Sequence, residues 1–131
     1  MGGRGRSYYY IVKRLKNYKN AVIDSNKFGN YILNPDKDPA KARFFKSLGY
    51  GMKNDKRLEA DIRAKLATNR ALAYELNERG DREYQVNMQL GINKKAMVAT
   101  AWIVRKGEDF PRFVTAYYNE KLEKRNRKNA N

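Results

Sequence analysis

The most regular pattern in the chain is an alternation of apolar and polar residues over positions 84–90. Every second side chain in this stretch is apolar, namely Tyr84, Val86, Met88 and Leu90. This period of two predicts a strand with one buried face. A continuous apolar run around Trp102, at 96–104, is typical of a central strand.

Two further stretches have strand character, at 71–76 and at 112–117. Turn-forming residues separate the four predicted strands, at 79–81, 91–94 and 106–109. Because consecutive strands joined by short turns pair with one another, the second half of the chain predicts a four-stranded antiparallel meander.

The first half has helical periodicity instead. Leu58, Ile62 and Leu66 recur at four-residue spacing, which predicts an amphipathic helix capped by Asn54 or Asp55. The apolar stripe of this helix is expected to cover one face of the sheet.

A second helix is predicted over 40–48, since Asp38-Pro39 combines an N-cap residue with proline at the first helical position. Its apolar face comprises Ala42, Phe45 and Leu48, and Gly49 ends it.

A short helix is expected over 27–33, capped by Asp24 or Ser25 and stopped before Pro35. Residues 8–18 are ambiguous between strand and helix, because β-branched and aromatic residues come first and a helical spacing follows.

These elements predict an α+β fold in which N-terminal helices pack on a four-stranded antiparallel β-meander. A single domain is expected over 21–118, with a basic N-terminal arm at 1–20 and a basic C-terminal tail at 119–131 that begins as a helix.

The charge is strongly positive and unevenly distributed. The chain of 131 residues carries a net charge of +15, yet 71–120 holds seven basic and seven acidic residues. The surplus therefore lies in the flanks and the helical half, as in proteins that bind polyanions. The side chains expected to bind nucleic acid are Arg4, Arg6, Lys13, Arg14, Lys16, Lys19, Arg43, Lys121, Lys124, Arg125, Arg127 and Lys128.

The absence of cysteine and histidine narrows the chemistry. It excludes disulfides, thiol nucleophiles, histidine bases and the usual zinc ligand sets, so we expect no metal and no cofactor. No apolar run approaches the roughly 20 residues of a membrane-spanning helix, so no membrane partner is expected.

Two clusters carry candidate chemistry. Lys41, Arg43 and Lys46 lie close together in the sequence, but their spacing spreads them around a helix and favours a solvated helix surface. On the last strand, alternation would place Phe113, Thr115 and Tyr117 on one face, where a hydroxyl and a phenol could bind phosphate. Without other context, an ordinary final strand is the favoured interpretation. The Tyr8-Tyr9-Tyr10 triplet fits packing or stacking on bases.

Four segments carry a resemblance to a known family: 31–35 (YILNP), 41–50 (KARFFKSLGY), 100–103 (TAWI) and 111–117 (PRFVTAY). Over about residues 21–118 the chain resembles an uncharacterised small domain at the C-termini of bacterial polymorphic toxins and phage head-associated proteins. That domain is grouped with the barnase–EndoU–colicin–RelE ribonuclease-like folds.

The resemblance implies metal-independent RNA cleavage through attack of the 2′-hydroxyl on the adjacent phosphate. Its implied site residues are Lys41 and Lys46 for phosphate binding, Arg112 for transition-state charge, and Thr115 with Tyr117 on the sheet. The family pattern often has a histidine between the Asn-Pro and Lys-Ala-Arg motifs. Here residues 36–40 read DKDPA, which suits a domain that keeps RNA binding without the chemistry.

The first hypothesis is therefore a small basic RNA-binding protein of ribonuclease-toxin-like fold, acting in the cytoplasm of a bacterial host cell on RNA or a ribonucleoprotein. Whether it is an endoribonuclease stays open. The alternative is a phage- or mobile-element-encoded inhibitor that binds a host nucleoprotein, such as a CRISPR effector, without catalysis. A third hypothesis is a phage structural protein.

Overall fold

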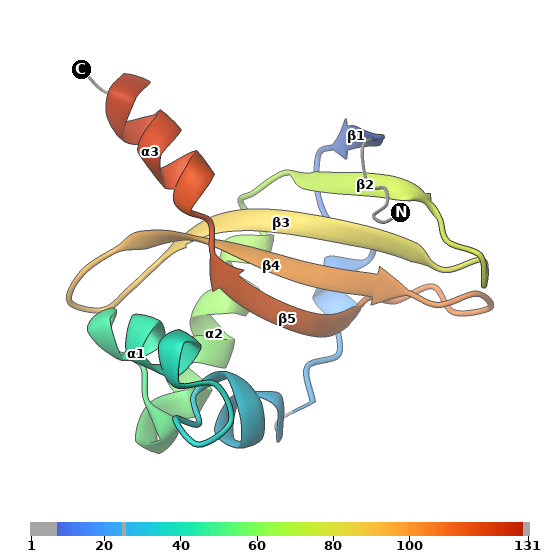
Figure 1. Cartoon of the computed structure of the whole chain (residues 1–131). Helices are drawn as coiled ribbons and strands as arrows, with labels where there is room; N and C mark the ends of the chain where they lie inside the picture. Colours follow the sequence, from blue (N-terminus) through green and yellow to red (C-terminus); the bar gives the residue numbers. More distant parts are fainter. Residues whose placement is uncertain (1–7, 25, 130–131) are drawn as a thin grey trace.

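A computed structural model, which describes residues 8–24 and 26–129, shows an α+β fold built on a five-stranded antiparallel sheet. Helices α1 (Pro39–Ser47) and α2 (Asp55–Leu66) lie on one side of the sheet, and α3 (Glu120–Asn129) projects on the other (Figure 1). The strands follow chain order, namely β1 (Tyr9–Val12), β2 (Ala71–Leu76), β3 (Arg82–Leu90), β4 (Ala96–Val104) and β5 (Arg112–Tyr118).

Strand β1 is the fifth strand, which the four-stranded prediction missed. It pairs antiparallel with β2, so the strand alternative for the ambiguous N-terminal segment is the one adopted. Leu15, just after it, is buried in the core. The expected arm at 1–20 thus contributes an edge strand and a core residue to the domain, and its first seven residues lie outside the described residues.

Strands β3 and β4 confirm the sequence pattern. They pair over their full length, from Arg82 opposite Val104 to Leu90 opposite Ala96. The four alternating apolar side chains of β3 are all buried. On β2 the fully buried side chains are the small Ala71 and Ala73, while Leu76 is exposed beyond a shift in register.

Strand β5 departs from the predicted alternation because it contains a bulge. Thr115 pairs with Ala101 and Phe113 with Trp102, so Val114 is an extra residue on this strand. Phe113 and Ala116 are both buried as a result. The expectation that Phe113 shares a face with Tyr117 is therefore wrong, since Tyr117 is 41% exposed.

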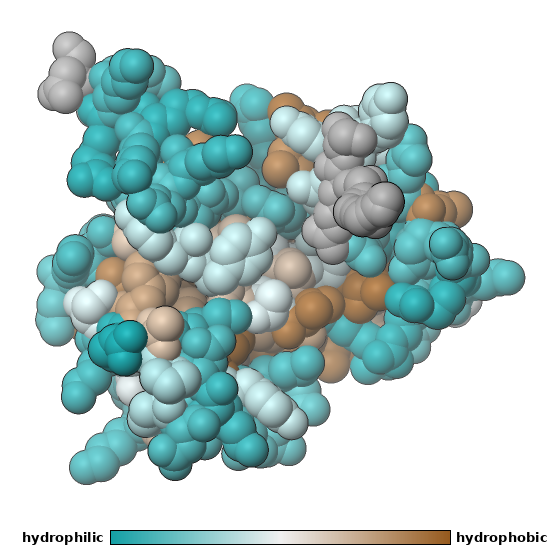
Figure 2. Space-filling model, in the orientation of Figure 1, coloured by the Kyte–Doolittle hydropathy of each residue, from teal (hydrophilic) through white to brown (hydrophobic). Residues whose placement is uncertain are grey.

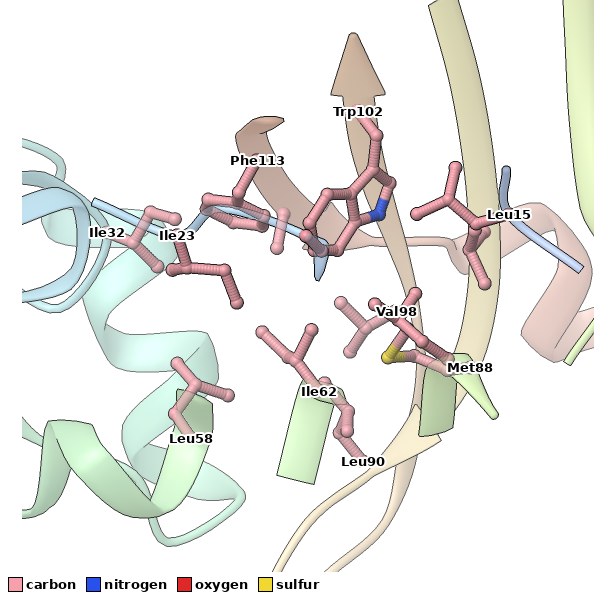
Figure 3. Close-up of a cluster of buried hydrophobic side chains, with 14 of the residues drawn as sticks. Leu15, Ile23, Ile32, Leu58, Ile62, Met88, Leu90, Val98, Trp102 and Phe113 are labelled. Atoms are coloured by element: carbon pink, nitrogen blue, oxygen red, sulfur yellow. The ribbon is translucent and has the colours of Figure 1, made fainter. Parts of the chain in front are cut away.

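The core lies between the sheet and the helices. Leu58, Ile62 and Leu66 of α2 are fully buried against it, as their spacing predicted. Figure 3 shows Leu58 and Ile62 facing Trp102 and other sheet residues, with Ile23 and Ile32 closing the same cluster. On α1 the predicted apolar face is buried as well.

The helix ends follow the predicted capping in part. The Asp38 carboxylate accepts a hydrogen bond from the Lys41 amide at 3.1 Å, which confirms it as the N-cap of α1. Asn54 precedes α2 but its side chain does not cap the helix. Its side-chain amide instead accepts from the Gly51 amide and donates to the Gly49 carbonyl. Short helical turns cover Tyr18–Asn20, Phe28–Ile32 and Met52–Asn54.

The predicted C-terminal tail is helical through most of its length. Asn119 caps α3 by accepting from the Leu122 amide at 3.1 Å. Glu123 accepts from the Met97 amide at 2.7 Å, which ties the helix to the start of β4. Among the described residues, no helix combines the length and apolar character needed to cross a bilayer.

Candidate functional site

The first turn of α1 meets the edge strand β5 through one polar contact. The Lys41 ammonium donates a 3.2 Å hydrogen bond to the Thr115 hydroxyl, across 74 positions of sequence. These two residues line a pocket of about 320 Å³, which we call the Lys41 pocket. Its other lining residues are Lys27, Tyr31, Ile32, Lys37, Asp38 and Val114.

The path of the chain explains why the pocket forms here. Val22 pairs with the first part of β5: its amide donates to the Pro111 carbonyl, and its carbonyl accepts from the Phe113 amide, both at 2.9 Å. Beyond Phe113 this edge is no longer paired with Val22, and the bulge at Val114 and Thr115 lines the pocket.

Two short segments supply the remaining groups. Lys27 and Tyr31 lie one helical turn apart, so both reach the same side of the segment. Asp24 begins this segment by accepting from the Asn26 amide at 3.0 Å, whereas the other predicted cap, Ser25, lies outside the described residues. Lys37 and Asp38 come from the loop before α1.

The balance of charge in the Lys41 pocket favours anions. Three lysines line it against a single carboxylate, and one oxygen of that Asp38 carboxylate already accepts from the Lys41 amide. The ammonium of Lys41 and the hydroxyls of Thr115 and Tyr31 supply hydrogen-bond donors. A phosphate group matches this combination of cations and neutral donors.

Only two of the five predicted catalytic residues come together, namely Lys41 and Thr115. Arg112 forms two 3.0 Å hydrogen bonds with Glu108, and these lower the pKa of the Glu108 carboxyl below its usual range. Lys46 lines a different pocket. Tyr117 is on the same strand as Thr115 but is not among the residues that line the Lys41 pocket.

A second pocket lies beside the first, between α1 and the segment that precedes α2. We call this space of about 450 Å³ the Lys46 pocket. Its lining residues are Leu33, Pro35, Ala42, Arg43, Lys46, Tyr50, Gly51, Met52 and Lys53. Helix α1 thus separates its cations as the spacing indicated, with Lys41 in one pocket and Arg43 and Lys46 in the other.

Most of the basic side chains expected to bind nucleic acid lie on the surface. Arg4 and Arg6 fall outside the described residues. Lys13, Lys16 and Lys19 are exposed, while Arg14 donates to the Ala67 carbonyl at 2.7 Å. The surface of α3 is hydrophilic (Figure 2), because its exposed cations are Lys121, Lys124, Arg125, Arg127 and Lys128. Lys124 also forms an ion pair with Glu120 at 2.7 Å.

The tyrosine triplet combines exposure with local packing. Tyr9 contacts Tyr74, with ring centroids 5.8 Å apart, and the Arg82 guanidinium lies over Tyr10. All three rings nevertheless remain more than half exposed, so both interpretations of the triplet, packing and base stacking, stand.

The chain matches a known protein family over most of its length. A family model described as a domain of unknown function (DUF6883) matches residues 14–120. The chain belongs to the DUF6883 family. The DUF6883 match includes every residue that lines the Lys41 and Lys46 pockets, and it leaves out β1 and nearly all of α3.

No curated protein and no solved structure matches the chain. Within residues 8–24 and 26–129, no group of three or more acidic side chains is arranged to hold a metal ion. The two pockets are therefore the features of this DUF6883 protein that bear on its function.

Proposed function

We propose that this protein binds RNA and holds one of its phosphate groups in the Lys41 pocket. The observation that carries the proposal is the hydrogen bond between Lys41 and Thr115, which fixes an ammonium beside a hydroxyl at the mouth of a basic pocket. A phosphate oxygen would accept from both groups, with Lys27 and Lys37 adding charge.

The overall charge supports the same function. Exposed cations at the N-terminal end and on α3 add a long-range attraction for a polyanion. The segment at 36–40, where the resembled ribonuclease-like family often has histidine, supplies Lys37 and Asp38 to this pocket. Two of the five site residues that the resemblance implies, Lys41 and Thr115, line it as well.

Binding can be measured by fluorescence anisotropy with a labelled single-stranded RNA in EDTA. Lys41→Met should weaken binding about tenfold or more, since a hydrogen bond to a charged group is worth about 1.5–3 kcal/mol. The slope of log affinity against log salt should fall by about 0.7, the contribution of one phosphate on a single strand.

The matched control is Lys56→Met, which removes the same charge from an exposed position on α2 away from both pockets. A control protein that loses as much affinity as Lys41→Met would contradict a specific phosphate site. Affinity that does not change with salt would contradict polyanion binding altogether.

RNA cleavage is the second candidate, and it is favoured by the presence of Asp38 in the same pocket as Lys41. The 2′-oxygen would lose its proton to the Asp38 carboxylate and bond to phosphorus. The bond from phosphorus to the 5′-oxygen would break, and the leaving oxygen would take a proton from the Lys41 ammonium.

Asp38→Asn tests this step cleanly, because asparagine keeps the N-cap of α1 but removes the base. We expect cleavage products from the wild-type protein in EDTA and none from Asp38→Asn, with RNA binding retained. Binding without cleavage by the wild-type protein would leave only the holding function and would support the alternative of an inhibitor that acts without catalysis.

A further inference from the structure

We propose that the Lys46 pocket receives a base of the same single-stranded RNA, next to the phosphate held in the Lys41 pocket. This inference rests on the proposed RNA binding and adds to it a means of distinguishing unpaired bases from a bare backbone.

The interior of the Lys46 pocket is apolar. Leu33, Ala42 and Tyr50 form buried parts of its wall, and Pro35 and Met52 complete it nearer the surface. A volume of about 450 Å³ falls in the range of about 300–1,000 Å³ that small organic groups occupy in proteins. A flat base would bury its faces here, whereas a phosphate alone would gain nothing from these side chains.

The polar groups of the pocket are cations. Arg43, Lys46 and Lys53 are exposed at its lining, and none of its nine described lining residues is acidic. The matching ligand therefore has an apolar body attached to negative charge, as a nucleotide unit does. The Arg43 guanidinium adds a planar group that stacks on unpaired bases in many RNA complexes.

The two pockets also adjoin one another. Ile32 and Lys41 line the Lys41 pocket, while the next residues in each case, Leu33 and Ala42, line the Lys46 pocket. Neighbouring residues are only about 3.8 Å apart between their Cα atoms. A chain that alternates phosphates with bases matches this juxtaposition of a pocket with three lysines and an apolar pocket with a cationic rim.

The pocket can be filled at a glycine. A Cβ built at Gly51 meets no atom within 4 Å, and this residue has an extended backbone that any side chain adopts. Gly51→Leu should therefore occupy the pocket without disturbing the fold. Gly29→Leu is the matched control, because Gly29 is equally open but lines neither pocket.

The experiment compares a labelled single-stranded RNA with an abasic ribose-phosphate oligomer of equal length, by anisotropy. The wild-type protein should prefer the RNA about fivefold or more, the value of one stacked base. In Gly51→Leu this preference should fall below about twofold while affinity for the abasic oligomer is unchanged; Gly29→Leu should keep the preference. Thermal melting checks that both variants fold.

Each contrary outcome has a separate meaning. Equal binding of both oligomers, still weakened by Lys41→Met, would overturn the base pocket and leave phosphate binding intact. A preference that survives in folded Gly51→Leu would place the base elsewhere. Failure to bind either oligomer would overturn both proposals. Tighter binding of an acidic peptide with Phe residues, lost in Gly51→Leu, would assign the pocket to a protein partner instead.

Discussion

The Tyr50 hydroxyl donates a 2.6 Å hydrogen bond to the Asp61 carboxylate and accepts one from the Gly91 amide at 3.0 Å. It therefore joins α2 to the turn between β3 and β4. Arg57 holds the same carboxylate at 3.0 Å. Tyr50 itself is only 1% exposed, and its side chain also forms part of the Lys46 pocket.

Removing this hydroxyl should destabilise the domain. Tyr50→Phe keeps the packing of the ring but leaves the Gly91 amide without its partner. It also leaves the Asp61 oxygen with Arg57, at 3.1 Å, in place of both donors. We expect a loss of about 1–3 kcal/mol in the free energy of unfolding, measured by urea denaturation. The conservative variant Tyr18→Phe, at a less buried tyrosine in the short helical turn after β1, is the control. An unchanged denaturation midpoint in Tyr50→Phe would show that the bond is not needed.

The same residue should make stability fall in alkali. Burial, followed by the hydrogen bond to Asp61, raises the pKa of Tyr50 above its ordinary value. Because the pKa of this tyrosine is higher in the folded than in the unfolded protein, its contribution to stability is complete below the unfolded-state pKa, near 10. The contribution is lost as the pH rises from there toward the folded-state pKa. Between pH 9 and about pH 11 the wild-type protein should lose more stability than Tyr50→Phe. Parallel loss in the two proteins would contradict this.

The stability of the protein should also depend on pH in acid, through Asp81. The Lys106 amide donates to the buried Asp81 carboxylate at 2.9 Å, and this bond is the main cause of a lowered pKa at Asp81. The stability from a lowered pKa is present above the unfolded value, about 3.9, and is lost as pH falls through the folded value.

Asp81→Asn should therefore be less stable than the wild-type protein at pH 7, and the difference should narrow at pH 3. Urea midpoints at the two pH values measure it, with Asp36→Asn, an exposed carboxylate on a loop, as the control. A difference that widens in acid would show that the charged form of Asp81 does not stabilise the fold.

Gly91 should not tolerate a side chain. Its φ is +144°, and a Cβ there would lie 1.8 Å from the Lys94 carbonyl oxygen. Gly91→Ala should cost more than about 1 kcal/mol, because both the backbone and the turn must shift. Gly29→Ala, with open space around its Cβ, should stay within about 1 kcal/mol of the wild-type protein in thermal melting. Equal melting temperatures would mean that the turn rearranges freely.

Local periodicity predicted the elements whose buried faces are visible in their own sequence. The apolar alternation of β3, the run of β4 and the stripe of α2 were all predicted, since each records burial on one or both faces. The sequence of β1 is ambiguous because an edge strand with exposed tyrosines lacks a clear alternation. The bulge of β5 was missed because Val114 has ordinary strand character.

Local sequence patterns predicted only some of the residues of the candidate site. Lys41 and Thr115 were named separately, but their contact spans 74 positions and depends on how α1 docks at the sheet edge. Lys27 and Tyr31 share one side of a helical turn, which was a usable signal. Lys37 and Asp38 gave no sign of a pocket, since a loop before an N-cap is polar in most proteins.

The extra residue in β5 has a consequence for how this family can vary. Phe113 and Ala116 point into the core while the two residues between them border the Lys41 pocket. Substitution at Val114 would change the pocket and leave the core intact. Deleting it would restore regular alternation, because Phe113 and Thr115 already pair with consecutive residues of β4, so Phe113 and Ala116 would still face the core and the pocket would lose one wall residue. A change of chain length at this bulge would therefore alter the wall of the pocket and spare the core.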